Sequence, residues 1–139
     1  MELLVFIGIP GAGKSTFYQS RFDTHLRVNL DQLRTRARET ALLRTCFEAG
    51  IRCVWDGTNL SRALRAPAIM AAREAGFRVH AFGFEPNFRA SIERNARRSG
   101  TARVPLAAIR GAAKRLQAPD WSEGFSSISR FGTAKTSFA

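Results

Sequence analysis

The stretch GIPGAGKS at residues 8–15 matches the pattern G-x-x-x-x-G-K-[ST] at every fixed position. It follows a continuous apolar run at residues 3–7 and opens a helical pattern that extends over residues 14–22. A short apolar run that ends in glycine is typical of a strand buried on both faces of a sheet. The stretch therefore predicts a strand, a phosphate-binding loop and a helix in direct succession.

Strand and helix patterns alternate along the rest of the chain. We expect further strands at residues 27–29, 52–55, 77–84 and 125–128, and helices at residues 31–48, 61–75, 86–98 and 104–116. This alternation predicts an α/β fold, namely a P-loop NTPase three-layer sandwich with a mostly parallel sheet. Residues 1–131 are expected to form one P-loop domain with a short helical lid at about 94–104, and residues 132–139 a flexible tail rich in Ser and Thr.

The composition is that of a globular protein that works in a reducing compartment. The 139 residues are 45% hydrophobic and include 11 Phe, which excludes a wholly disordered chain. No stretch approaches the ~20 consecutive apolar residues that span a bilayer, and the N-terminus lacks a basic signal region. The two cysteines, Cys46 and Cys53, form neither a disulfide framework nor a metal cluster. A cytoplasmic protein with no membrane partner is the expectation.

The positive charge is concentrated after residue 60. The chain has 22 Lys and Arg against 11 Asp and Glu, and residues 61–139 alone carry a net charge of +9. Of the basic residues, 19 are Arg, whose fork suits phosphate oxygens. Two interpretations stay open, a surface for a polyanion or a genome that favours arginine. The second is preferred for four arginines without an assigned role: Arg62, Arg65, Arg73 and Arg110.

The chemistry of the GIPGAGKS loop predicts a nucleoside triphosphate site. Glycines allow the backbone N–H groups to turn toward phosphate oxygens, and the helix that follows directs its positive end at them. Lys14 can bridge the β- and γ-phosphates and Ser15 can ligate Mg²⁺. ATP and Mg²⁺ are thus the expected cofactors. The expected ATP-binding residues of the loop are Gly8, Pro10, Gly11, Ala12, Gly13, Lys14, Ser15 and Thr16.

Two acidic positions lie where ligands of parallel sheets bind. Asp31 and Arg34 begin a predicted helix, so they could act as a general base and as a grip for an acceptor phosphate, or simply form an i,i+3 ion pair near a helix start. Asp56 ends a predicted strand, where it could support the metal and phosphate site or form an Asx turn.

Three arginines share one face of a later predicted helix. Arg94, Arg97 and Arg98 are spaced at i, i+3 and i+4, so they could close over the ATP phosphates as a lid or form a solvated basic face.

The order of these motifs resembles the kinase domain of polynucleotide 5′-kinases, of phage and eukaryotic types alike. The matching pieces are GIPGAGKST at 8–16, DQLR at 31–34, DGTNL at 56–60, RNARR at 94–98 with VP at 104–105, and AP at 118–119 with EGF at 123–125. They span residues 3–130, and the ordered set is more specific than the phosphate loop alone.

The resemblance implies transfer of the ATP γ-phosphate to the 5′-hydroxyl end of DNA or RNA. On this basis Lys14, Asp31 and Arg98 are the expected catalytic residues, with Asp31 as general base. Substrate binding is assigned by the resemblance to Asp31, Arg34, Asp56 and Asn59. One extra residue lies between Arg98 and Gly100 relative to the phage type, so Arg97 could replace Arg98.

The resemblance covers the kinase domain alone and does not extend to the second activity of bifunctional family members. The phosphatase domain of bifunctional members has no counterpart here, so a separate 3′-end-processing or ligase protein is an expected partner. Two alternatives remain open. One is a small-molecule P-loop kinase of the sugar-acid, antibiotic or toxin type, against which the basic charge weighs if the acceptor is neutral. The other is a nucleotide-dependent binding module, which would need no base at position 31.

Overall fold

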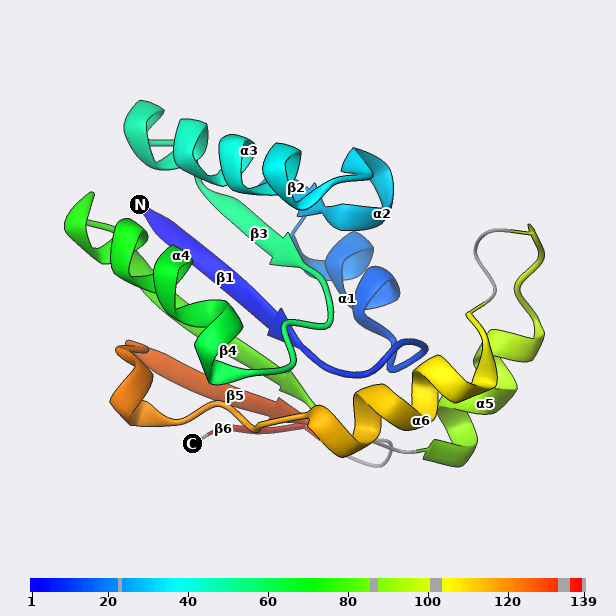
Figure 1. Cartoon of the computed structure of the whole chain (residues 1–139). Helices are drawn as coiled ribbons and strands as arrows, with labels where there is room; N and C mark the ends of the chain where they lie inside the picture. The colour runs from blue at the N-terminus through cyan, green and yellow to red at the C-terminus, as the bar shows by residue number, and fades with distance from the viewer. Residues whose placement is uncertain (23, 86–87, 101–103, 133–135, 139) are drawn as a thin grey trace.

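The computed structural model describes residues 1–22, 24–85, 88–100, 104–132 and 136–138 (Figure 1). Side chains are described in these ranges except at Ser15, Thr16, Gln19, Ser20, Phe88, Ala90, Ser91, Arg94 and 136–138. Within the described residues no helix is both long and apolar enough to cross a membrane.

Strands and helices alternate along the chain. The strands are β1 (Glu2–Ile7), β2 (Leu26–Asn29), β3 (Cys53–Asp56), β4 (Arg78–Phe84), β5 (Ser127–Phe131) and β6 (Thr136–Phe138). The helices are α1 (Lys14–Arg21), α2 (Leu30–Leu33), α3 (Arg36–Ala49), α4 (Arg62–Glu74), α5 (Phe88–Ala96) and α6 (Leu106–Arg115), with a short 3₁₀ turn η2 (Trp121–Glu123).

The described strands form one sheet in the order β2-β3-β1-β4-β5-β6. The first five strands of this order run parallel, and β6 pairs antiparallel with β5. The predicted α/β sandwich with a mostly parallel sheet is confirmed. Because β1, β2 and β3 are neighbours and parallel, the loops that follow them meet at one edge of the sheet.

The central strand β1 contributes side chains to the hydrophobic cores on both faces of the sheet, because successive side chains of a strand point to opposite faces. Leu3, Val5 and Ile7 belong to the core beneath α3 and α4. Leu4 and Phe6 belong to the core beneath α1, where the Phe6 ring contacts the ring of Phe17 at a centroid distance of 5.7 Å. The sheet is therefore covered on both faces (Figure 1).

The helix predicted over residues 31–48 is interrupted in the structure. Helix α2 ends at Leu33, and the next residue, Arg34, adopts the left-handed backbone conformation with φ of 77°. Thr35 then caps α3, since its Oγ1 accepts a hydrogen bond from Arg38 N at 3.2 Å. The interruption changes which side chains share a face with Asp31, and this matters for the site described below.

The C-terminal part also differs from the prediction. The last parallel strand begins at Ser127 instead of Phe125, and within the expected tail Thr136–Phe138 forms β6. The backbone of Phe131 pairs with Thr136 and that of Ser129 with Phe138. Strand β5 is therefore paired on both sides, with β4 and with β6.

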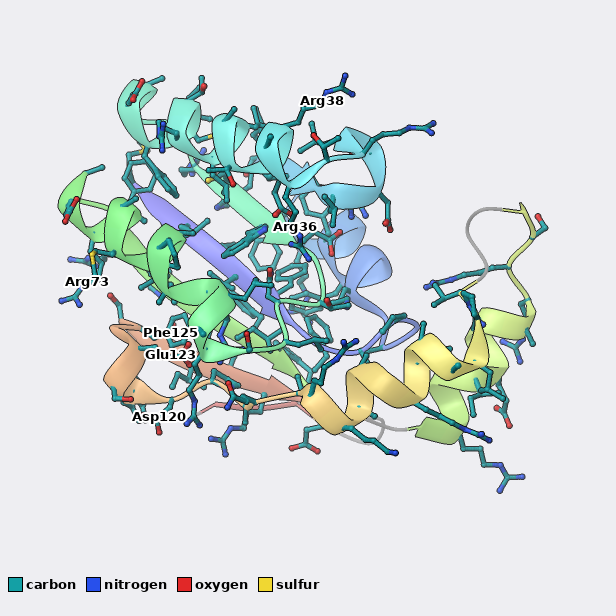
Figure 2. All side chains as sticks on the ribbon, viewed as in Figure 1. Arg36, Arg38, Arg73, Asp120, Glu123 and Phe125 are labelled. Atoms are coloured by element: carbon teal, nitrogen blue, oxygen red, sulfur yellow. The ribbon has the colours of Figure 1, made fainter. Side chains whose placement is uncertain are left out.

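A buried ion pair joins α4 to the segment between α6 and β5. Arg65 is completely buried, and its guanidinium donates to both carboxylate oxygens of Glu123 at 2.8 Å. It also donates to the carbonyl oxygens of Asn59 at 2.7 Å and Gln117 at 3.0 Å. Glu123 lies beside α4 in Figure 2. The sequence assigned no role to Arg65, and that interpretation is wrong because the side chain links three segments of the chain.

Replacing Arg65 should therefore destabilise the fold strongly. In Arg65→Met the buried carboxylate of Glu123 loses its partner, and we expect the free energy of unfolding to fall by about 3–5 kcal/mol. The matched control is Arg52→Met, an exposed arginine next to β3, which should lose less than about 0.5 kcal/mol. Urea denaturation measures both. Similar small losses in the two variants would show that the buried pair does not stabilise the fold.

Candidate active site

The phosphate-binding loop connects β1 to α1 and needs glycine at several positions. Gly11 and Gly13 have φ of 81° and 98°, in the left-handed region that other residues rarely adopt. A Cβ at Gly8 would lie 2.9 Å from the Cβ of Phe84 in β4, so only glycine fits this close approach. The backbone N–H of Gly8 also donates to Thr58 O at 3.0 Å. The loop is thus held against the neighbouring strand ends.

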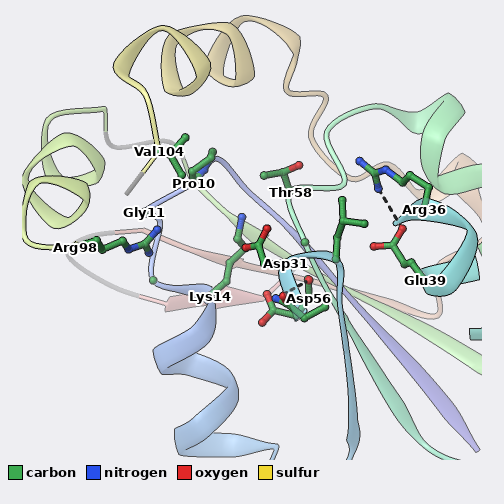
Figure 3. A pocket seen from close by; sticks show the side chains of 14 residues that line it. Pro10, Gly11, Lys14, Asp31, Arg36, Glu39, Asp56, Thr58, Arg98 and Val104 are labelled. Carbon is green, nitrogen blue, oxygen red and sulfur yellow. Dashed lines mark hydrogen bonds and ion pairs between the residues drawn. The ribbon is translucent and has the colours of Figure 1, made fainter. Parts of the chain in front are cut away.

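A pocket of about 260 Å³ lies over this loop, at the carboxyl ends of β1, β2 and β3 (Figure 3). The predicted site residues that line it are Pro10, Gly11, Gly13, Lys14, Asp31, Asp56 and Arg98. The other lining residues, which were not predicted as site residues, are Asn29, Leu30, Arg36, Glu39, Gly57, Thr58 and Val104. In Figure 3, Lys14, Asp31 and Asp56 lie in the middle, Arg98 on the side of the lid, and Arg36 with Glu39 on the opposite side.

The ammonium group of Lys14 lies at the phosphate-binding loop, close to two backbone carbonyl groups. Its Nζ donates hydrogen bonds to the carbonyl oxygen of Gly8 and, at 3.2 Å, to that of Ile9. Burial lowers the pKa of Lys14 from 10.5 to about 8; the negative charges of Asp56 and Asp31 oppose this shift, and the positive charge of Arg98 adds to it. An anionic ligand in the pocket would therefore favour the protonated form of Lys14.

Asn29 positions Asp31 at the start of α2. The Asn29 Oδ1 accepts from Gln32 N at 3.2 Å, which caps the helix, and its Nδ2 donates to Asp56 O at 3.2 Å. Asp31 is thus fixed beside the end of β3. Asn29 stands directly before a predicted helix, a position where asparagine commonly caps the helix, so the sequence could have identified it as the capping residue.

Asp56 is buried and already paired. Its Oδ2 accepts from Arg27 Nε at 2.7 Å and lies 2.6 Å from Arg27 Nη2. The carboxylate lines the pocket, but one of its oxygens is engaged by this guanidinium. Asp56 therefore contributes negative charge near Lys14 from a fixed position, and Asp31 is the more exposed of the two carboxylates.

Arg36 and Glu39 close the pocket on the side away from the lid. The Arg36 Nη1 lies 3.1 Å from the Glu39 Oε1, and the Glu39 side chain is only 4% exposed. In the sequence they belong to an ordinary charged helix, so no signal separated them from exposed neighbours. They reach the pocket because the break at Arg34 starts a new helix, which brings its first turn to the sheet edge.

Asn95 joins two described parts of the segment predicted as a lid, the end of α5 and Val104. This buried side chain donates from Nδ2 to Val104 O at 2.5 Å and accepts at Oδ1 from Val104 N at 2.6 Å. Val104 and Arg98 both line the pocket, whereas Arg97 is exposed and is not among the lining residues. The placement favours Arg98 over Arg97 as the arginine that faces a ligand.

Two predicted substrate-binding residues do not line the pocket. Asn59 is buried, with an exposed fraction of 2%, and its Nδ2 donates to Phe6 O at 2.8 Å and Trp55 O at 3.3 Å. It ties the ends of β1 and β3 together, and its contact with substrate remains a prediction. Arg34 is exposed at the end of α2 and is likewise not among the lining residues.

The remaining predicted residues cannot be placed in the same way. Gly8 and Ala12 shape the loop and are not among the residues that line the pocket. The side chains of Ser15, Thr16 and Arg94 lie outside the described ones. Among the described residues no group of three or more His, Cys, Asp or Glu could hold a metal ion.

These features define a class of protein. A glycine-rich loop between a parallel strand and a helix, with its lysine in a pocket at the carboxyl edge of the sheet, is the arrangement of P-loop nucleotide-binding proteins. The chain belongs to the AAA domain family, whose sequence profile matches residues 34–119.

Solved structures share this fold at low sequence identity. A sugar kinase from Janibacter sp. HTCC2649 is 18% identical with a TM-score of 0.67, over 97% of this chain and 87% of that one. Kti12 of Chaetomium thermophilum, in complex with ADP-AlF3, is 14% identical with a TM-score of 0.67, over 95% and 89%. The APS kinase CysC of Mycobacterium tuberculosis, in complex with AMPPNP and APS, is 17% identical with a TM-score of 0.60, over 96% and 89%. The chain thus has the fold of P-loop kinases.

The lowered pKa of Lys14 predicts that nucleotide binding takes up a proton in mildly alkaline solution. Above a pH of about 8 the free protein has partly lost this proton, and a polyphosphate restores it by favouring the charged lysine. The affinity for AMPPNP should accordingly fall as the pH rises through about 8 to about 10. Titration calorimetry in two buffers of different ionisation enthalpy measures the proton uptake.

Lys14→Met should abolish both the uptake and most of the affinity. Lys114→Met, which alters an exposed lysine at the end of α6, should leave them unchanged. Binding without proton uptake in the unmodified protein would contradict the assignment of Lys14.

Proposed function

We propose that this protein is an ATP-dependent kinase that transfers the γ-phosphate of ATP to a hydroxyl group of a small molecule. The proposal is carried by one observation. The carboxylate of Asp31 and the ammonium of Lys14 line the same pocket of about 260 Å³, which Arg36 and Glu39 close on the side away from the lid. A base and a phosphate-binding cation in one compact pocket suit transfer to a small acceptor.

The proposed step is an in-line displacement at the γ-phosphorus. The acceptor oxygen forms a bond to phosphorus while the bond from phosphorus to the β,γ-bridging oxygen breaks, and ADP leaves. Asp31 takes the proton of the acceptor hydroxyl. Lys14 and Arg98 balance the negative charge of the phosphates from two sides of the pocket.

Mg²⁺ is the expected companion of ATP at this site. The hydroxyl of Ser15, directly after Lys14, would hold it, and the ion would supply charge neutralisation between the β- and γ-phosphates. The donor set fits, because hard oxygen ligands from a hydroxyl and phosphates suit Mg²⁺ and no dedicated cage of protein carboxylates is needed.

The solved structures with this fold support a small acceptor. Two of them carry the names of small-molecule kinases, a sugar kinase and an APS kinase, and the latter was solved with APS bound. At 18% and 17% identity these similarities concern the fold, so the acceptor of this chain is inferred from its own pocket.

Asp31→Asn tests the proposal. The substitution keeps the shape of the side chain and removes the base, so phosphoryl transfer should slow by a factor of about 10²–10⁴ while AMPPNP affinity stays within about twofold. Transfer is measured with γ-labelled ATP and a panel of small hydroxylated compounds, including sugars, sugar acids and hydroxylated nucleotides. Gln32→Ala, an exposed neighbour on the same helix, is the control and should retain full activity. Normal turnover in Asp31→Asn would exclude Asp31 as the base.

A polynucleotide 5′-hydroxyl kinase is the second candidate. It is favoured by the net charge of +9 over residues 61–139 and by the exposed position of Arg34, beside the helix that carries Asp31. One observation weighs against this candidate: Arg34 does not line the pocket in which Asp31 lies, so the two residues do not face a common pocket.

Salt separates the two candidates. A polynucleotide acceptor should lose affinity steeply as salt rises, by about 0.7–0.9 logarithmic units per phosphate contact and per tenfold change in salt concentration. A small acceptor with one or no phosphate should show a slope of about one or less. The KM for a 5′-hydroxyl oligonucleotide, measured at several salt concentrations, provides the slope. Rapid labelling of oligonucleotides with a steep slope would establish the second candidate instead of the first.

A further inference from the structure

A second cavity lies beside the first, between α3 and α4 and against β3. Its volume is about 220 Å³. Arg36 and Glu39 line both cavities, so the second one adjoins the pocket of Lys14 and Asp31. In Figure 2, Arg36 lies on the inner side of α3 and Arg38 on its outer side. The first turn of α3 therefore forms the wall between two adjoining spaces.

The walls of this second cavity are mainly apolar. They include Leu43 and Phe47 of α3 and Leu64 and Pro67 of α4. Trp55 of β3 also lines the cavity and is only 3% exposed. Such a space suits the apolar part of a small organic molecule.

Two of the residues that line this cavity each carry a buried side-chain atom that has no hydrogen-bond partner among the described residues. The two atoms are Glu39 Oε2 and Trp55 Nε1. The third such atom, Asn59 Oδ1, lines neither cavity. A buried polar group without a partner costs about 1–3 kcal/mol, so each is expected to meet a ligand or solvent group.

The two atoms need hydrogen-bond partners of opposite kind, one an acceptor and the other a donor. The indole of Trp55 can only donate a hydrogen bond, and the ionised carboxylate of Glu39 can only accept one. A hydroxyl group has the chemistry to satisfy both kinds of group, because its oxygen can accept from an N–H and its hydrogen can be donated to a carboxylate oxygen. One water could do the same, but it needs roughly 10–15 Å³, which is far less than the cavity offers. An apolar body that carries a hydroxyl fits the whole space.

We propose that the cavity between α3 and α4 binds the body of the acceptor, a small alcohol with an apolar face, and that Trp55 and Glu39 grip one of its hydroxyl groups. The inference rests on the proposed kinase function, and it names the class of acceptor. A further hydroxyl of the same molecule reaches the pocket of Asp31 past the shared wall of Arg36 and Glu39.

The indole of Trp55 provides a direct readout of this contact. The chain has two tryptophans, and Trp121 is 52% exposed on η2, away from the cavity. In a Trp121→Phe background the single indole N–H resonance in a ¹H–¹⁵N spectrum therefore comes from Trp55. The probes are cyclohexanol, which donates and accepts a hydrogen bond, and cyclohexanone, which only accepts. Each is titrated at millimolar concentration without nucleotide, since compounds of this size bind weakly.

We expect cyclohexanol to shift the Trp55 indole resonance saturably and cyclohexanone to bind about tenfold more weakly, because the ketone leaves Glu39 unsatisfied. Glu39→Gln should weaken cyclohexanol binding about tenfold. Glu48→Gln on the same helix, where the side chain is exposed, should leave it unchanged. No saturable shift, or equal binding of the alcohol and the ketone in the unmodified protein, would overturn the proposal and leave water as the occupant.

A transfer assay with cyclohexane-1,4-diol and γ-labelled ATP separates this proposal from the proposed function. Binding at Trp55 with no transfer to this diol or to any small alcohol would contradict the kinase function while supporting the binding site. Transfer to a small alcohol that neither shifts the Trp55 resonance nor depends on Glu39 would contradict the cavity alone.

Discussion

The buried guanidinium of Arg65 stabilises the edge of the sheet at which the candidate active site lies. It binds the carboxylate of Glu123 and the carbonyl oxygens of Asn59 and Gln117, so the loop after β3 is fixed to the C-terminal segment. That loop in turn accepts a hydrogen bond from Gly8 through the carbonyl of Thr58. A chain of contacts thus runs from Glu123 to the start of the phosphate-binding loop. An arginine suits this role because its five donors can satisfy several acceptors at once in a buried site.

Charge is distributed unevenly between the two sides of the pocket. Arg98 on the lid side and Lys14 in the middle are the cations that can face a polyphosphate. Asp56, also in the middle, is paired with Arg27, and on the far side Arg36 is paired with Glu39. The cations available to an anionic ligand therefore lie around the phosphate loop. The far side offers paired charges and one carboxylate oxygen of Glu39, which suits a neutral hydroxylated molecule better than a second polyanion.

The features that were predicted from the sequence are those that depend on local residue patterns and on spacing along the chain. The phosphate loop, the parallel sheet and the placement of Lys14, Asp31 and Asp56 around one pocket follow from strand-loop-helix succession, because parallel strands bring their following loops to one edge. The early end of the helix was not predicted, because the left-handed conformation of Arg34 interrupts an otherwise helical pattern. Arg65, Glu39 and Trp55 could not be recognised, since their roles depend on burial between segments distant in sequence. An arginine in an Arg-rich chain gives no signal of its own that it is buried.

Direct competition between the two classes of acceptor tests the central claim most sharply. The protein is incubated with γ-labelled ATP, Mg²⁺, an extract of small metabolites and an equal quantity of 5′-hydroxyl oligonucleotides, and the label is then separated by molecular size. If the pocket between Lys14 and Glu39 selects the acceptor, the label appears in small phosphomonoesters, and Asp31→Asn nearly abolishes it. Label confined to the oligonucleotides would contradict the account.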